Sequence, residues 1–227
     1  MTTRLELLPD VYLTAVQTSR FKTACFSLSF LRPLRQEEAG MNALLPSVLL
    51  RGSESAPSIR AIADRLDALC GASVGSLVRK KGEIQLTGLF ADGLEDRYAG
   101  EPVFSRLLEL TAELLLRPRT QGGVFVPQIV MQERQKLLDT IESTLDDKAE
   151  YCQTQLLRQM CRGEAYAVGR LGEAGPLAAV DEAALWAHYQ KVLASSRAEL
   201  FYLGSKPAQE VAALLRPLLK KGEKIPF

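Results

Sequence analysis

Residues Gly40–Ser53 read G-M-N-A-L-L-P-S-V-L-L-R-G-S, an apolar stretch entered from a strand and closed by Arg-Gly-Ser. The strand before it, Ala24–Arg32, places Phe26, Leu28 and Phe30 on one side. That alternation is the period-2 pattern of a strand with one face on a core. The stretch therefore lies at the junction between a strand and a helix, and the other segments are organised around this junction.

A short apolar helix is predicted over residues 42–51. Asn42 is a suitable N-cap, because its side chain can accept a bond from a free backbone N–H of the first turn. Residues 35–40 before it are charged and are predicted to form a loop. Pro46 would then lie at about the fourth helical position, where a missing N–H costs no intrahelical bond.

The rest of the chain contains blocks of strands and of helices. Because the strands come partly in blocks, we predict an α+β fold, a mainly antiparallel sheet with helices packed against it, in a single domain over residues 1–227. The helix at 126–162 is long and is predicted to bend near residues 146–147. Further strands are expected at 3–8, 11–18, 72–79, 83–90 and 197–204, and further helices at 57–70, 103–117, 181–194 and 206–219.

Composition excludes several classes of function. Of the 227 residues 47% are hydrophobic, enough for a sizeable core, and 28 basic residues nearly balance 27 acidic ones. No strong basic field is available for nucleic acid. The start of the chain lacks the apolar core of a signal peptide, and no run reaches the roughly 20 apolar residues of a membrane helix. A cytoplasmic protein that binds neither nucleic acid nor membrane is expected.

Cysteine and histidine usage limits the metal chemistry. Cys25, Cys70, Cys152 and Cys161 form no C-x-x-C pair and are predicted to be buried free thiols. The single histidine, His188, lies in a helical pattern and is predicted to be structural. A zinc site with two histidines cannot be built from one. A serine hydrolase is disfavoured as well, since the chain has no G-x-S-x-G elbow.

The order of these segments resembles one half, the N-terminal one, of a pitrilysin/insulinase-type metallopeptidase, the family that includes mitochondrial processing peptidase. Gly40–Ser53 is similar to the family's Gly, inverted zinc motif His-x-x-Glu-His and closing Lys-Gly-Thr. S-I-R-A-I-A-D-R-L-D-A-L-C-G (58–71) is similar to its next helix. F-V-P-Q-I-V-M-Q-E-R-Q-K-L-L-D-T-I-E (125–142) is similar to the helix that carries its third zinc ligand, and L-F-Y-L-G-S (200–205) to its closing strand.

The resemblance places none of the family's catalytic side chains in this chain. With Arg51-Gly52-Ser53 on Lys-Gly-Thr, the two histidines correspond to Ala43 and Ser47 and the catalytic glutamate to Pro46. Zinc needs about three nitrogen, oxygen or sulfur ligands, which these residues do not supply. Proline cannot act as a general base.

The third zinc ligand of the family falls on or near Thr140. Glu133 and Glu142 lie close enough in sequence to leave this assignment open. Together these replacements imply a non-catalytic member that holds no zinc and needs no other cofactor.

Inactive members of this family commonly pair with an active one around a shared chamber, and paired inactive and active members are known in several bacteria. The pattern A-L-L-P-x-V-L-x-R-G resembles the inactive type. The resemblance thus implies a bacterial subunit that pairs with an active homologue or a second half and helps to form a peptide-binding chamber. The family's polypeptides usually hold two such halves, and the ending K-K-G-E-K-I-P-F (220–227) is typical of a linker.

A peptide site is predicted on the strand after the second helix. Residues 73–79 are similar to the family's edge strand, and an extended peptide can add to such an edge through main-chain bonds. The contacts would come from Ser73, Val74, Gly75 and Ser76. An ordinary hairpin strand explains the same residues equally well.

Two other functions remain open at this point. One is a metallopeptidase with a relocated site, for example among Asp146, Asp147 and Glu150, although a solvated helix face explains that acidic run more simply. The other is a peptide-binding module that works alone.

Overall fold

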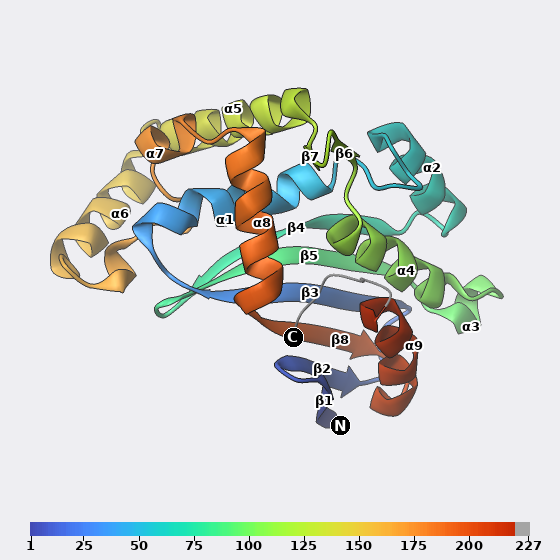
Figure 1. Cartoon of the computed structure of the whole chain (residues 1–227). Helices are drawn as coiled ribbons and strands as arrows, with labels where there is room; N and C mark the ends of the chain where they lie inside the picture. Colours follow the sequence, from blue (N-terminus) through green and yellow to red (C-terminus); the bar gives the residue numbers. More distant parts are fainter. Residues whose placement is uncertain (221–227) are drawn as a thin grey trace.

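The computed structural model describes residues 1–220, which form a six-stranded sheet with helices on one of its faces (Figure 1). The strand order is β1-β2-β8-β3-β5-β4, and all neighbours are antiparallel except β2 and β8. The predicted α+β fold is confirmed. The sheet consists of β1 (Thr2–Leu8), β2 (Val11–Gln17), β3 (Thr23–Pro33), β4 (Ser73–Lys81), β5 (Ile84–Leu94) and β8 (Arg197–Gly204), and β6 (Thr120–Gln121) and β7 (Val124–Phe125) form a separate hairpin.

The helices follow the predicted order, with short additions that the sequence did not indicate. Across residues 1–220 no helix has the length and apolar character needed to cross a bilayer. The ending predicted as a linker lies, from residue 221 on, outside the described residues. The helices are α1 (Gln36–Leu49), α2 (Ile59–Ala68), α3 (Asp96–Ala99), α4 (Val103–Leu116), α5 (Pro127–Ser143), α6 (Lys148–Met160), the 3₁₀ turn η1 (Ala165–Ala167), α7 (Ala174–Ala178), α8 (Glu182–Ser195) and α9 (Ala208–Lys220).

The two faces of the sheet differ in what covers them. On β3, Phe26, Leu28 and Phe30 point into the core under the helices and are buried, as their alternation predicts. Helices α1, α4, α8 and α9 pack along this face. The opposite face is open and forms a groove of about 970 Å³ in which Phe90 and Phe201 are more than one third exposed.

The predicted start of α1 was wrong. The helix begins at Gln36, so residues 36–40 are its first turns and Asn42 lies in its interior, not at its N-cap. Gly40 is thus a helical residue, and a Cβ atom on it would make only ordinary contacts of 3.5 Å with Leu177. A Cβ atom on Gly172, which has a φ of +75°, would come within 2.4 Å of the Gly40 nitrogen. Gly172 is therefore the position that requires glycine, because the loop before α7 approaches α1 closely there.

The single long helix expected at 126–162 is two helices. The side chain of Asp147 caps α6 by accepting bonds from the N–H groups of Ala149 and Glu150, both at 3.0 Å. An aspartate that binds the backbone in this way favours a new N-terminus over helix continuation. The predicted bend near 146–147 is thus a break, and α6 folds back beside the end of α5 (Figure 1).

The prediction of buried cysteines was also wrong. All four are free thiols, but Cys70 and Cys152 are exposed and Cys25 and Cys161 are half-buried. Cys70 follows the end of α2 with a φ of +58°, and Cys152 lies on the outer side of α6. An apolar neighbourhood in sequence did not place these side chains in the core.

Candidate functional site

Helix α1 lies between the sheet, α5 and α8, and carries the positions that the sequence matched to a zinc motif. Ala43 and Pro46 are buried and Ser47 is half-buried. Thr140 is exposed on α5, where its hydroxyl donates to the carbonyl of Lys136 at 2.8 Å. A methyl group, a proline ring and two neutral hydroxyls are not the ligands that zinc requires. The residues at these positions do not fit a metal ion.

Pro46 is accommodated by a specific neighbour. A proline inside a helix has no N–H for the carbonyl four residues earlier, which here belongs to Asn42. The hydroxyl of Thr87 on β5 donates to that carbonyl at 2.6 Å. Thr87 is 1% exposed, so the bond replaces the missing helical one inside the core. The residue at the position of the catalytic glutamate is therefore part of a packed and satisfied helix.

The closing Arg51-Gly52-Ser53 also has a structural role. The guanidinium of Arg51 forms an ion pair with the nearly buried Glu133 on α5. The hydroxyl of Ser53 donates to Glu113 on α4 at 2.7 Å. Hydrogen bonds from Ser53 and Ser55 hold the pKa of Glu113 below its usual value, although burial acts in the opposite direction and is the largest single effect. The end of α1 is thus tied to two other helices.

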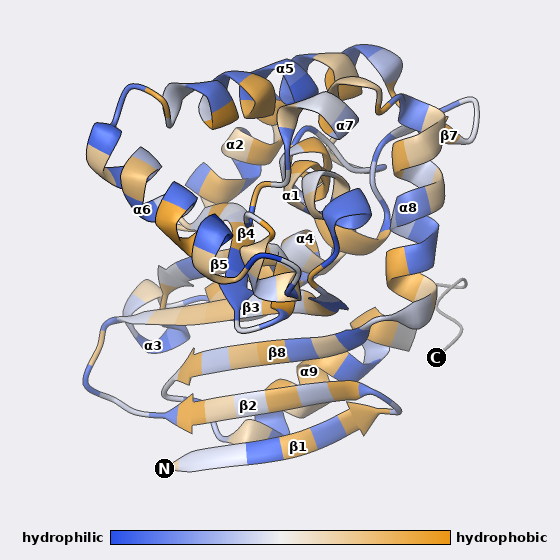
Figure 2. Cartoon of the chain, turned by 90° about the vertical axis from the view of Figure 1, so that its left-hand side faces the viewer, coloured by the Kyte–Doolittle hydropathy of each residue, from blue (hydrophilic) through white to orange (hydrophobic). Residues whose placement is uncertain are grey.

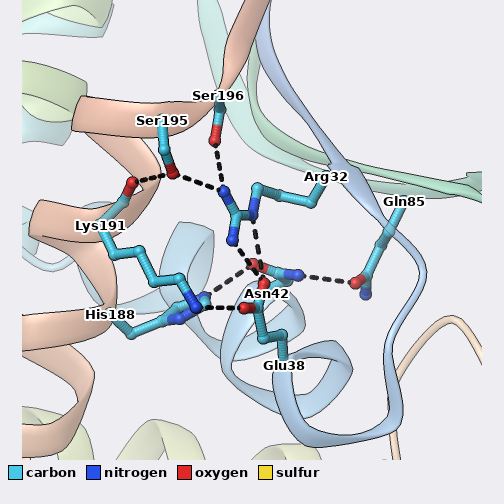
Figure 3. A network of polar contacts seen from close by, with 8 residues as sticks. All are labelled: Arg32, Glu38, Asn42, Gln85, His188, Lys191, Ser195 and Ser196. Atoms are coloured by element: carbon cyan, nitrogen blue, oxygen red, sulfur yellow. Dashed lines mark hydrogen bonds and ion pairs between the residues drawn. The ribbon is translucent and has the colours of Figure 1, made fainter.

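A buried chain of amide groups holds the middle of α1 (Figure 3). The side-chain nitrogen of Gln85 donates to the carbonyls of Ala39 and Arg170, at 3.0 and 2.7 Å. The Gln85 oxygen therefore accepts from the Asn42 nitrogen at 2.9 Å, which turns the Asn42 oxygen toward Nε2 of His188 at 2.7 Å. Since that oxygen can only accept, His188 must carry its proton on Nε2.

A charged cluster holds the same helix one turn earlier. Two guanidinium nitrogens of Arg32 on β3 donate to one carboxylate oxygen of Glu38, at 2.6 and 3.2 Å. Lys191 on α8 donates to the other oxygen at 2.6 Å. Arg32 also donates to the hydroxyls of Ser195 and Ser196. Figure 3 shows these side chains converging from β3, α1 and α8.

The two clusters shift the titration of their members. Burial lowers the pKa of His188 to about 4, with Glu38 opposing the shift and Arg32 and Lys191 adding to it. For Glu38 burial acts upward, but the hydrogen bonds and charges of Lys191 and Arg32 outweigh it and lower the pKa to about 2. His188 is thus neutral and Glu38 ionised at neutral pH. Together the two clusters fix α1 to the sheet and to α8.

Sequence patterns did not reveal these two clusters. His188 was predicted to be structural, and its burial and bond to Asn42 agree with that. Glu38 and Asn42 were assigned to a loop and a cap, and nothing singled out Gln85. The spacing of four residues between Glu38 and Asn42 could have indicated one shared helix face, had the helix been extended upstream.

The predicted peptide residues Ser73, Val74, Gly75 and Ser76 all lie on β4, at the edge of the sheet. Within residues 1–220, β4 pairs with β5 and no strand covers its other edge. The ring of Phe90 lies over Gly75, where an added Cβ would come within 2.4 Å of it. The hydroxyl of Ser73 donates to Asp92 at 2.6 Å. The edge position is confirmed, and peptide binding there stays a prediction.

A relocated metal site has no geometric support. In the part of the chain that the structure describes, no three His, Cys, Asp or Glu side chains are grouped so that they could hold a metal ion. Asp147 is engaged as the cap of α6. The carboxylates of Glu142 and Glu150 share a cavity of about 440 Å³ between α5, α6 and residues 169–174 with Arg158 and other side chains.

Comparisons with known proteins agree with this site. No family model matches the chain. It is 30% identical over 211 residues to "Probable inactive metalloprotease YmfF" of Bacillus subtilis (strain 168). The aligned region covers 92% of this chain and 50% of the relative. A conserved protein from Enterococcus faecalis V583 superposes with a TM-score of 0.89 at 27% identity, over 96% of this chain and 52% of that one.

A third comparison concerns the fold alone. A peptidase M16 inactive domain from Pseudomonas fluorescens superposes with a TM-score of 0.75 at 16% identity, over 100% of this chain and 51% of that one. The chain thus spans about half the length of each of these relatives.

Proposed function

Since the chain belongs to the M16, or pitrilysin/insulinase-type, peptidase family as a non-catalytic half, we propose that it pairs with an active homologue or a second half and holds an extended peptide on β4. The observation that carries the proposal is the combination of a packed, ligand-free α1 with an open strand edge beside it. Catalysis needs the lost side chains, whereas strand addition needs only a backbone edge.

The composition of β4 supports peptide binding. Its first six residues, Ser73–Val78, carry no charge and no proline. Edge strands that must stay unpaired usually carry charged residues or proline. The opposite edge strand, β1, does so, with Arg4 and Glu6 in its centre. On β4 the charges begin only at Arg79, and Lys80 holds that end of the strand to the carbonyl of Val168 at 3.0 Å.

The uncovered face of the sheet supports the pairing. Phe90 and Phe201 are 36% and 38% exposed in a groove that also contains Leu31 and Leu86. Exposed aromatic and aliphatic side chains in such a groove are typical of a surface that another protein unit covers. The relatives are about twice as long as this chain, which leaves room for such a unit in each of them. We therefore place the partner's contribution on the helix-free side of the sheet, next to β4.

Proline substitution tests the peptide site. Adjacent strand residues direct their N–H groups to opposite edges. Of Ser76→Pro and Leu77→Pro, one therefore removes a donor to β5 and the other a donor on the open edge. We expect the variant that loses the open-edge donor to keep its melting temperature. Its affinity for short fluorescent Val/Thr-rich peptides should fall at least about tenfold, a loss of about 1.4 kcal/mol of binding free energy.

A matched peptide supplies the control for this experiment. Backbone N-methylation of the probe keeps its side chains but removes main-chain donors, so it should weaken binding to the unmodified protein to a similar extent. Binding that neither proline nor N-methylation affects would place the peptide elsewhere. In that case the edge would be an ordinary hairpin strand.

A further inference from the structure

The helix-free side of the edge strand β4 carries an ordered set of side chains. In Figure 2 the strands follow one another upward from β1 through β2, β8 and β3 to β5 and β4. Alternate residues of a strand lie on the same face. In the register with β5, Gly75 lies opposite Phe90, which lines the open groove. The open-face row of β4 therefore consists of Ser73, Gly75, Leu77, Arg79 and Lys81.

The ring of Phe90 fills the place of the side chain that Gly75 lacks. A Cβ atom on Gly75 would lie 2.4 Å from Cε1 and 2.6 Å from Cζ of the ring, which reaches from β5 across β4 toward the open edge. The side chain remains 36% exposed. Residues directly opposite each other on paired strands have Cβ atoms about 4.5–5.5 Å apart. A residue that an added peptide strand places opposite Gly75 would therefore contact the Phe90 ring.

The other end of the row is positively charged. Arg79 and Lys81 are exposed and, within residues 1–220, take part in no ion pair. Their direct neighbours on β5 are the apolar Leu86 and Ile84. A carboxylate opposite Arg79 would gain an ion pair, whereas a basic residue there would meet a like charge. This end of the row therefore favours an acidic residue in a bound strand.

We propose that β4 selects peptides with a large apolar or aromatic residue opposite Gly75 and an acidic residue opposite Arg79. These two peptide residues are four positions apart and lie on one face of the bound strand. The inference rests on the edge binding proposed above and adds which peptides bind there. In strand addition the main-chain bonds supply affinity, and contacts with alternate side chains supply specificity. Phe90 and Arg79 are the residues that determine specificity.

Peptides of defined spacing test the selectivity. Short fluorescent Val/Thr-rich peptides with Phe-x-x-x-Glu, made in both orders to cover both directions of pairing, are compared by fluorescence anisotropy with a peptide that has only Val and Thr. One order should bind at least about fivefold more tightly than that peptide, because its aromatic ring is partly buried on Phe90. Peptides of the same composition with Phe-x-x-Glu should lose this gain, since a spacing of three puts the two side chains on opposite faces.

Variants of the protein assign the two preferences to their residues. Phe90→Ala should abolish the preference for Phe over Ala in the peptide. Phe201→Ala is the control, because Phe201 is 38% exposed on the same face but lies on β8, away from the edge. Arg79→Glu should reverse the charge preference, so that a peptide with Lys in place of Glu binds more tightly. Arg20→Glu makes the same change in net charge at an exposed residue between β2 and β3 and should not reverse it.

The outcomes separate this inference from edge binding itself. Peptides that bind in a proline-sensitive way but equally well at spacings of three and four would overturn the selectivity and leave edge binding intact. The Phe90 ring would then only cover a glycine within the sheet. Equal effects of Phe90→Ala and Phe201→Ala, or a charge preference that Arg20→Glu also reverses, would overturn it as well. If no peptide binds at all, edge binding and its selectivity both fail.

Discussion

Replacing Arg32 with alanine is expected to lower the free energy of unfolding by about 3–5 kcal/mol, because it leaves the buried carboxylate of Glu38 without its buried guanidinium partner. Both side chains are only 7% exposed and meet at 2.6 Å. Lys191 remains bound to Glu38, which favours the lower end of this range. Urea unfolding followed by the fluorescence of Trp186, the single tryptophan, measures the loss.

A matched ion pair supplies the control. Arg4 and Glu199 also meet at 2.6 Å, but the Arg4 side chain is 46% exposed. Exposed pairs contribute about 0–1 kcal/mol, so Arg4→Ala should cost no more than that. Equal losses in the two variants would mean that burial does not set the strength of the Arg32 pair. The charged cluster would then not be what holds α1 to β3 and α8.

Acidification is expected to destabilise the protein by about 3 kcal/mol between pH 6.5 and 4, through His188 alone. Burial lowers the pKa of this imidazole from its ordinary 6.5 to about 4. The unfolded chain therefore takes up a proton in this range while the folded chain does not, and stability falls as the pH falls. Unfolding in urea across this pH range measures the slope.

The variant His188→Gln should remove that slope while keeping a donor for Asn42. Glu38 provides an internal reference, because its pKa is lowered from 4.5 to about 2 and its contribution is lost only below pH 4.5. The variant should therefore still lose stability below that pH. If it kept the full slope between pH 6.5 and 4, His188 would not be the group held neutral in the core.

The strands could be predicted from sequence because their alternation is local. Phe26, Leu28 and Phe30 define their own face, and their burial follows from period 2 alone. The same holds for the cap of α8, where Asp181, at the start of the helix predicted at 181–194, accepts from the N–H of Ala184. The absence of zinc ligands on α1 could also be predicted from sequence, because it depends on residue type and spacing within fourteen residues.

The rest of the site depends on contacts that sequence patterns do not encode. Asn42 and His188 are 146 positions apart and meet only because α8 crosses α1. The close approach of Gly172 to Gly40 likewise joins residues more than a hundred positions apart, so the sequence around Gly40 does not indicate it. Cys152 was predicted to be buried, because an amphipathic pattern indicates an apolar face but not the direction in which that face points. That direction is set by what the neighbouring elements leave uncovered.

The central proposal is that this chain, a non-catalytic half, works beside an active unit. The most direct measurement is the zinc content and peptide-cleaving activity of the chain purified gently from its own source. We expect no zinc on this chain, together with a co-purifying homologue that carries His-x-x-Glu-His and all of the chelator-sensitive activity. Stoichiometric zinc on the chain alone, with cleavage that a chelator abolishes, would contradict the account.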